Sequence, residues 1–158
     1  QGTYLGPGFG WGLGAFWGST TPAIDRTTVR SMSWRLEYPQ RPWTLNRERK
    51  ENHFARATRV KEWRDAFHLL ALEAKVPRLP AIGLDVQARL TGVQQDPVAL
   101  FPAYKAALDG IVDAGVVPDD TWEFVKNVNF LPPEKGKPHA LIVWIYEANP
   151  NQDPIPGD

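Results

Sequence analysis

Residues 96–120 read DPVALFPAYKAALDGIVDAGVVPDD, and this stretch is the part of the chain that says most about its fold. Within it, Leu100, Tyr104, Ala107 and Ile111 recur at three- and four-residue spacing, as on the apolar face of an amphipathic helix. Gly115 follows, and glycine is the residue that most often ends a helix. The pattern therefore predicts a helix near residues 100–114.

A further helix and four strands surround this stretch. Apolar residues at helical spacing predict a helix near 56–75, and strict alternation predicts strands near 33–38 and 82–90. Two more apolar segments predict strands near 122–130 and 140–146, the second of them central in its sheet. A polar, basic loop is expected between Trp43 and Asn52. The order βαβαββ indicates an α+β fold, a small mixed sheet with two helices packed on one face.

The chain divides into three segments of different composition. Residues 1–31 hold recurrent glycines between aromatic residues, which predicts an extension or appended segment without regular structure. An aromatic arm that docks on a partner is the alternative. The ordered domain is expected over residues 32–147, from the single methionine onward, and the proline-rich residues 148–158 are expected to be extended.

The charges are balanced in number but unevenly distributed. The chain has 18 basic and 18 acidic residues, so its net charge of zero gives no indication about nucleic acid. Ten basic residues nevertheless lie between Arg30 and Arg64 against four acidic ones, which predicts a basic surface at one end of the fold. The absence of cysteine excludes disulfides and thiolate metal sites. No stretch approaches the roughly 20 apolar residues of a membrane span, so no membrane contact is expected.

The stretch at 96–120 resembles the phage members of the RusA family of Holliday-junction resolvases. Those proteins carry D-P-D-N-L-x-P, a lysine on the following helix, then D-G-hydrophobic-V-D-A-G and a later D-D. The segments Pro42–Asn46 and Lys61–Arg64 also look like the phage proteins. The resemblance covers about 115 residues, 32–147, and includes the order of elements.

The resemblance implies a Mg²⁺-dependent endonuclease that acts on branched DNA as a homodimer, in the cytoplasm of a bacterial host. In that family, carboxylates gather the metal, which positions a water and stabilises charge on the phosphate. By position, Asp96 matches the first acid, Asp120 the third acid and Lys105 the lysine. Val98 stands at the place of the second acid and Ala99 at the place of the asparagine. Asp119 is the adjacent candidate for the missing ligand.

Ordinary structural roles are the alternative for each of these residues. Asp96 before Pro97, and the pair Asp119 and Asp120, are typical of turns and helix starts. Lys105 is equally compatible with a solvated helix face. The three histidines show no ligand spacing and are expected to be non-catalytic; they are His53, His68 and His139.

The basic segment after Trp43 is the expected DNA contact. Its candidate phosphate ligands are Asn46, Arg47, Arg49, Lys50, Arg56 and Arg59. Trp43, His53 or Phe54 would stack on an exposed base, whereas a solvated basic loop is the alternative. Two functions remain open at this point. One is a branched-DNA endonuclease of a phage or prophage, and the other is a non-catalytic descendant that binds DNA or a host protein without cutting.

Overall fold

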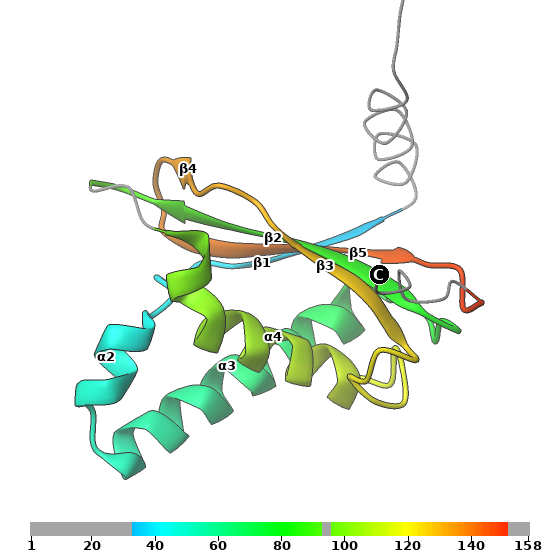
Figure 1. The fold of residues 1–158 in the computed structure, drawn as a ribbon, viewed down its shortest axis with the longest axis horizontal. Helices are drawn as coiled ribbons and strands as arrows, with labels where there is room; N and C mark the ends of the chain where they lie inside the picture. Colours follow the sequence, from blue (N-terminus) through cyan, green and yellow to red (C-terminus); the bar gives the residue numbers. More distant parts are fainter. Residues whose placement is uncertain (1–32, 93–95, 152–158) are drawn as a thin grey trace, which may run out of the picture. The chain divides into compact units, whose positions relative to one another are not determined.

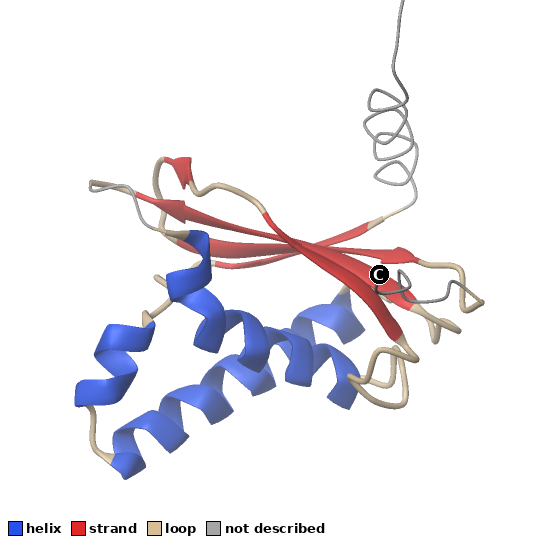
Figure 2. Cartoon of the chain, in the orientation of Figure 1, coloured by secondary structure: helices blue, strands red, loops and turns tan. Residues whose placement is uncertain are grey.

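The computed structural model describes residues 33–92 and 96–151, which form a mixed sheet with helices on one face (Figures 1 and 2). The strand order is β1-β5-β2-β3, with β1 (Trp34–Tyr38) and β2 (Ile82–Leu90) both antiparallel to β5 (Ala140–Glu147). β3 (Val125–Phe130) is parallel to β2, and the short β4 (Glu134–Lys135) pairs with the last residues of β2. The predicted α+β class is confirmed, and β5 is central as predicted.

Two helices cover the sheet on the same side (Figure 2). They are α3 (His53–Glu73) and α4 (Phe101–Asp113), and the 3₁₀ helix η3 (Pro97–Leu100) leads directly into α4. Alternate residues of the strands face these helices, because side chains in a strand alternate between its two faces. The buried core therefore joins Leu84 and Val86 of β2 and Val143 of β5 to Phe67 of α3 and Ile111 of α4.

The segment predicted as a loop between Trp43 and Asn52 contains a helix, α2 (Leu45–Lys50). Thr44 begins it, since its side chain accepts a hydrogen bond from the N–H of Arg47 at 3.3 Å. α3 likewise begins earlier than expected, because Asn52 accepts from the N–H of Ala55 at 2.9 Å. A six-residue helix with little apolar surface has no periodicity to detect, so the capping residues were its only signal.

The strand expected from residue 122 begins at Val125. A turn precedes it, in which the N–H groups of Phe124 and Val125 both donate to the carbonyl of Thr121, at 3.0 and 2.9 Å. The expected extension at 1–31 lies outside the described residues, and so does most of the tail. None of the helices within the described ranges combines the length and hydrophobicity that a bilayer crossing requires.

Polar side chains hold β3 to the rest of the sheet on the face away from the helices. Asn129 donates to the buried carboxylate of Asp85 at 2.7 Å, and the Tyr146 hydroxyl donates to Asn127 at 2.7 Å. The ring of Tyr146 covers Gly83, where an added Cβ would lie 2.3 Å from it. These contacts fix β3 at the edge of the sheet beside β2.

α3 and α4 approach one another closely at Gly110. A Cβ at this position would lie 2.3 Å from the carbonyl oxygen of Arg64 and 3.0 Å from the Cβ of Phe67. The Arg64 side chain also binds Asp113 at the end of α4, with Nη2 to Oδ1 at 2.8 Å. The crossing of the helices therefore fixes α4, and with it the position of η3 and Asp96.

We expect Gly110→Ala to lower the free energy of unfolding by about 1–3 kcal/mol, because the added methyl group must displace backbone atoms of α3. Chemical denaturation of both proteins measures the difference. Gly136→Ala is the matched control, since its Cβ would meet only the Arg89 side chain at 3.5 Å. Equal stability of the Gly110 variant and the parent would show that the helices separate without cost.

Candidate nucleic-acid interface

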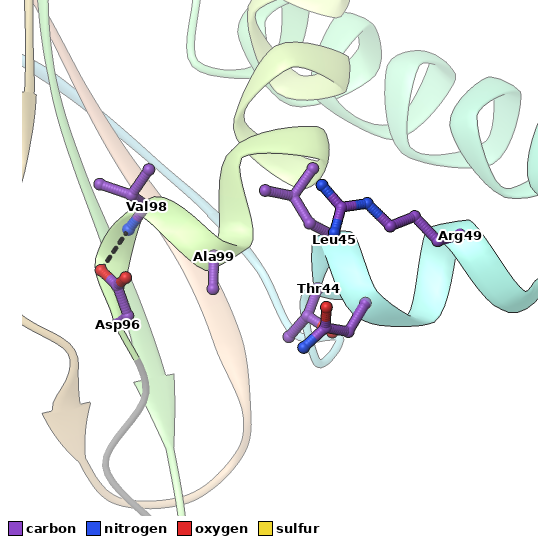
Figure 3. Close-up of a pocket in the computed structure, with 7 residues that line it drawn as sticks. Thr44, Leu45, Arg49, Asp96, Val98 and Ala99 are labelled. Carbon is purple, nitrogen blue, oxygen red and sulfur yellow. Dashed lines mark hydrogen bonds between the residues drawn. The ribbon is translucent and has the colours of Figure 1, made fainter.

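An open pocket of about 320 Å³ lies between α2 and η3 (Figure 3). Asn46 and Arg49 of α2 line one side, and Asp96, Val98 and Ala99 line the other. The pocket thus brings residues predicted to contact DNA beside the first residue of the predicted catalytic motif. Sequence spacing alone did not indicate this, because about fifty residues separate the two groups.

Asp96 acts as the cap of η3. Its Oδ1 accepts a hydrogen bond from the N–H of Val98 at 3.0 Å (Figure 3). Val98, which replaces the second acid of the resembled motif, is 55% exposed, so an apolar side chain faces solvent at the pocket. Asp96 therefore has the helix-start role that was the alternative to metal binding. Its other carboxylate oxygen has no hydrogen bond to another described residue.

Lys105 lies between two carboxylates. Its Nζ donates to Asp109 and, at 2.7 Å, to Oδ2 of Asp120. Burial alone would lower the pKa of Lys105, but the hydrogen bonds and charges of the two aspartates outweigh it and raise that pKa. The same hydrogen bond from Lys105 lowers the pKa of Asp120. The structure therefore joins the predicted lysine to the predicted third acid as an ion pair.

Tyr104 is a residue of this region that sequence reasoning treated only as core. Its side chain is 4% exposed, and its hydroxyl has no hydrogen-bond partner among the described residues. Burial, and then the charge of Asp96, raise the pKa of this phenol. A tyrosine at a helical core position carries no signal of such a neighbour, because the loop and helix must fold before Asp96 comes near.

The predicted magnesium ligands are not gathered into a metal site. Mg²⁺ requires several oxygen ligands in octahedral geometry, whereas Val98 and Ala99 have no side-chain oxygen and Asp120 binds Lys105. Asp119 Oδ1 accepts from the N–H of Asp120 at 2.8 Å. No three acidic or histidine side chains within 33–92 and 96–151 form a group that could hold a metal. The donor set does not fit the ion.

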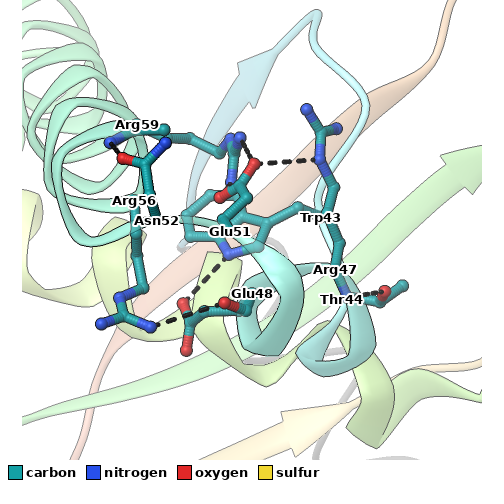
Figure 4. Close-up of polar contacts among 9 residues, drawn as sticks. Trp43, Thr44, Arg47, Glu48, Glu51, Asn52, Arg56 and Arg59 are labelled. Carbon is teal, nitrogen blue, oxygen red and sulfur yellow. Dashed lines mark hydrogen bonds and ion pairs between the residues drawn. The ribbon is translucent and has the colours of Figure 1, made fainter.

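The predicted phosphate ligands divide into two groups in the structure. Arg59 binds Glu51 and lies over the ring of Trp43 at 5.4 Å, and its side chain is 16% exposed (Figure 4). Arg47 also binds Glu51, at 3.3 Å, and Arg56 donates to the carbonyl of Glu48 at 3.4 Å. Arg56 and Arg59 therefore connect α3 to α2, whereas Arg47 binds the C-cap residue of its own helix and its side chain is 61% exposed.

Asn46, Arg49 and Lys50 form the second group, which is exposed. Arg49 and Lys50 make no ion pair with any residue that the structure describes. Trp43 is 2% exposed and donates its indole N–H to Glu48 at 3.1 Å, so it is a core residue and the expected stacking on a base is wrong for it. Phe54, at 81% exposure, keeps the geometry that such stacking needs.

Comparison with other proteins gives no family for this chain. Neither the models of known protein families nor the curated proteins match it.

We expect Arg59→Ala to lower the thermal midpoint by several degrees and Arg49→Ala to leave it nearly unchanged. The first substitution removes the bond to Glu51 and the contact with Trp43, whereas Arg49 has no ion pair within the described part of the chain. Circular dichroism melts of the two variants make the measurement. Equal midpoints would mean that Arg59 does not hold α2 to α3.

The ion pair of Lys105 gives a pH-dependent prediction. The pKa of Asp120 is lower in the folded protein, so its carboxylate stabilises the fold above its unfolded pKa, and this contribution disappears as the pH falls through the folded value. Asp120→Asn should therefore reduce stability at neutral pH, and its difference from the parent should shrink as the pH falls below the usual aspartate range. Urea denaturation across this range tests it. A difference that persists in acid would exclude the ion pair as its cause.

Proposed function

We propose that this protein is a RusA-like phage or prophage protein that binds branched DNA, such as a Holliday junction, without metal-dependent cleavage. The observation that carries the proposal is the pocket between α2 and η3, where exposed Asn46 and Arg49 face the position of the resembled motif. A guanidinium and an amide in one open pocket suit a phosphate group, which accepts hydrogen bonds from both.

Arg49 is the principal phosphate ligand in this proposal. It lines the pocket, lies beside Lys50 in sequence and makes no ion pair with a carboxylate of the described ranges; the Asp96 carboxylate lines the opposite side of the same pocket. Charged donors to phosphate oxygens position a protein on nucleic acid without reading its sequence. Recognition of a branched structure would then depend on the shape of the surface around the pocket, with exposed Phe54 available for an unpaired base.

The chemistry of the pocket argues against cleavage. The side chains of Val98 and Ala99 have no oxygen that could bind a metal, and the carboxylate of Asp120 is paired with Lys105. The described side chains therefore lack the set of carboxylates that would hold a metal ion for the activation of a water. This favours the non-catalytic descendant over the endonuclease.

A homodimer belongs to the same proposal, because a four-way junction presents paired arms to two copies of one surface. A host protein in place of DNA is the second candidate. It is favoured by two exposed apolar residues that phosphate binding does not require: Val98, which lines this pocket and is 55% exposed, and Phe101 at the start of α4, which is 46% exposed.

We expect Arg49→Ala with Lys50→Ala to weaken binding of a labelled four-way junction by about 2 kcal/mol, at roughly 1 kcal/mol for each phosphate contact. Binding of the parent should fall steeply with salt and should persist in EDTA. Fluorescence anisotropy measures all three effects. Asp96→Asn is the control. It removes a negative charge from the pocket, so it should leave the affinity for the junction unchanged or raise it. Unchanged affinity of the double variant would remove this pocket from the interface.

We expect Val98→Asp with Ala99→Asn to create Mg²⁺ binding that the parent lacks. Both residues lie at the start of η3, where aspartate and asparagine are favoured and the helix dipole stabilises negative charge. Calorimetric titration with Mg²⁺ measures binding, and a junction-cleavage assay runs in parallel. Val98→Asn with Ala99→Asn is the matched control without the new carboxylate. Junction cleavage by the parent would contradict the proposed loss of activity.

A further inference from the structure

A separate apolar pocket of about 70 Å³ lies between α4 and β3. Phe101, Tyr104 and Leu108 of α4 line one side of it, and Val128 and Phe130 of β3 line the other. The rings of Tyr104 and Phe130 stack with their centroids 5.0 Å apart, so the wall is firmly packed. Because an apolar cavity of about 150 Å³ takes up benzene, a pocket about half that size suits a single aliphatic side chain.

β3 is the last strand of the sheet, so one of its two sides has no neighbouring strand (Figure 1). The N–H of Leu131 donates to the carbonyl of Val86 at 2.9 Å, and alternate residues of a strand turn their N–H and C=O groups to the same side. Those of Val128 and Phe130 therefore point away from β2. Within the described residues, no backbone hydrogen bond joins this outer side of β3 to another segment.

Two lysines lie on the strands that form the same edge of the sheet. Lys126 of β3 and Lys135 of β4 both lie on strands that pair with this side of β2, and neither makes an ion pair with a described residue. Lys126 lies over the ring of Trp122 at 5.1 Å instead. Glu134 is the single carboxylate of these two strands, and it is bound to Arg89 at 3.0 Å. The edge is therefore complementary to an acidic segment.

We propose that the groove between β3 and α4 binds an extended, acidic peptide segment of another protein. The segment adds to the free edge of β3, bonds with the outward N–H and C=O groups of Val128 and Phe130, and places one aliphatic side chain in the pocket. Its carboxylates lie near Lys126 and Lys135. Strand addition of this kind obtains affinity from main-chain hydrogen bonds and specificity from the pocket for an alternate side chain. The inference does not depend on the proposed binding of DNA.

The probe is a capped heptapeptide with leucine at its centre, threonine beside it and glutamate at each end. We expect it to bind the full-length protein and to slow hydrogen exchange of the amides of Val128 and Phe130, because these N–H groups acquire acceptors. Amide exchange measured by NMR with and without the peptide detects this. A peptide with lysine in place of each glutamate is the matched control and should bind about tenfold more weakly or less.

Three variants separate the parts of the groove. Val128→Pro removes one outward donor at a position where an edge strand accepts proline, and should weaken binding about fivefold. Leu108→Trp fills the pocket and should abolish binding, whereas Leu69→Trp, at a residue 65% exposed on α3, should not affect it. Lys126→Glu with Lys135→Glu should weaken binding at least tenfold, and Arg78→Glu should leave it unchanged. Circular dichroism establishes that each variant is folded.

Several outcomes would overturn the proposal. One is no binding of the acidic peptide at millimolar concentration, and another is binding without protection of Val128 and Phe130. If exchange of the same amides slows as the protein concentration is raised without peptide, and sedimentation shows a dimer, the edge binds a second copy of this chain. Protection by a four-way junction would assign it to nucleic acid.

Discussion

The close crossing of α3 and α4 at Gly110 is the constraint on which the surfaces of this protein depend. A side chain as small as alanine would meet the carbonyl of Arg64 there, so α4 lies directly against α3. α4 carries η3 at its beginning and Lys105 on its second turn. The distance between the helices therefore decides where Asp96 and Lys105 lie relative to α2 and the sheet.

Around the residues that match the resembled motif, the structure shows ion pairs in place of a set of metal ligands. A resolvase of that family would bind a metal with its carboxylates, but here the single Lys105 ammonium forms ion pairs with both Asp109 and Asp120. An internal cation of this kind keeps the acids charged and the helix in place without any ligand. This arrangement is compatible with the proposed binding of DNA without a metal ion.

Tertiary contacts decide which of the basic residues are available to bind a ligand. In the sequence, Arg47, Arg49 and Arg59 look equivalent, yet Glu51 binds Arg47 and Arg59 and leaves Arg49 at the pocket. Arg59 lies against Trp43, which is itself buried, so both are part of the framework that holds α2 on α3. A cation contributes to recognition where no carboxylate of the same protein has already bound it.

Local patterns in the sequence determined the α+β class, the two main helices, the four longer strands and the central place of β5, because side-chain periodicity records which face of each element is buried. They did not determine α2, whose six residues are held by the Thr44 cap and by contacts with α3, nor the late start of β3 after the turn at Thr121. The sequence also identified Asp96, Lys105, Asp120 and the basic segment as a candidate site. Only the tertiary structure decided that Arg49 faces Asp96, that Lys105 binds Asp120 and that Trp43 is buried. Those relations join residues far apart in the chain, and their distances depend on the packing of whole elements rather than on local sequence.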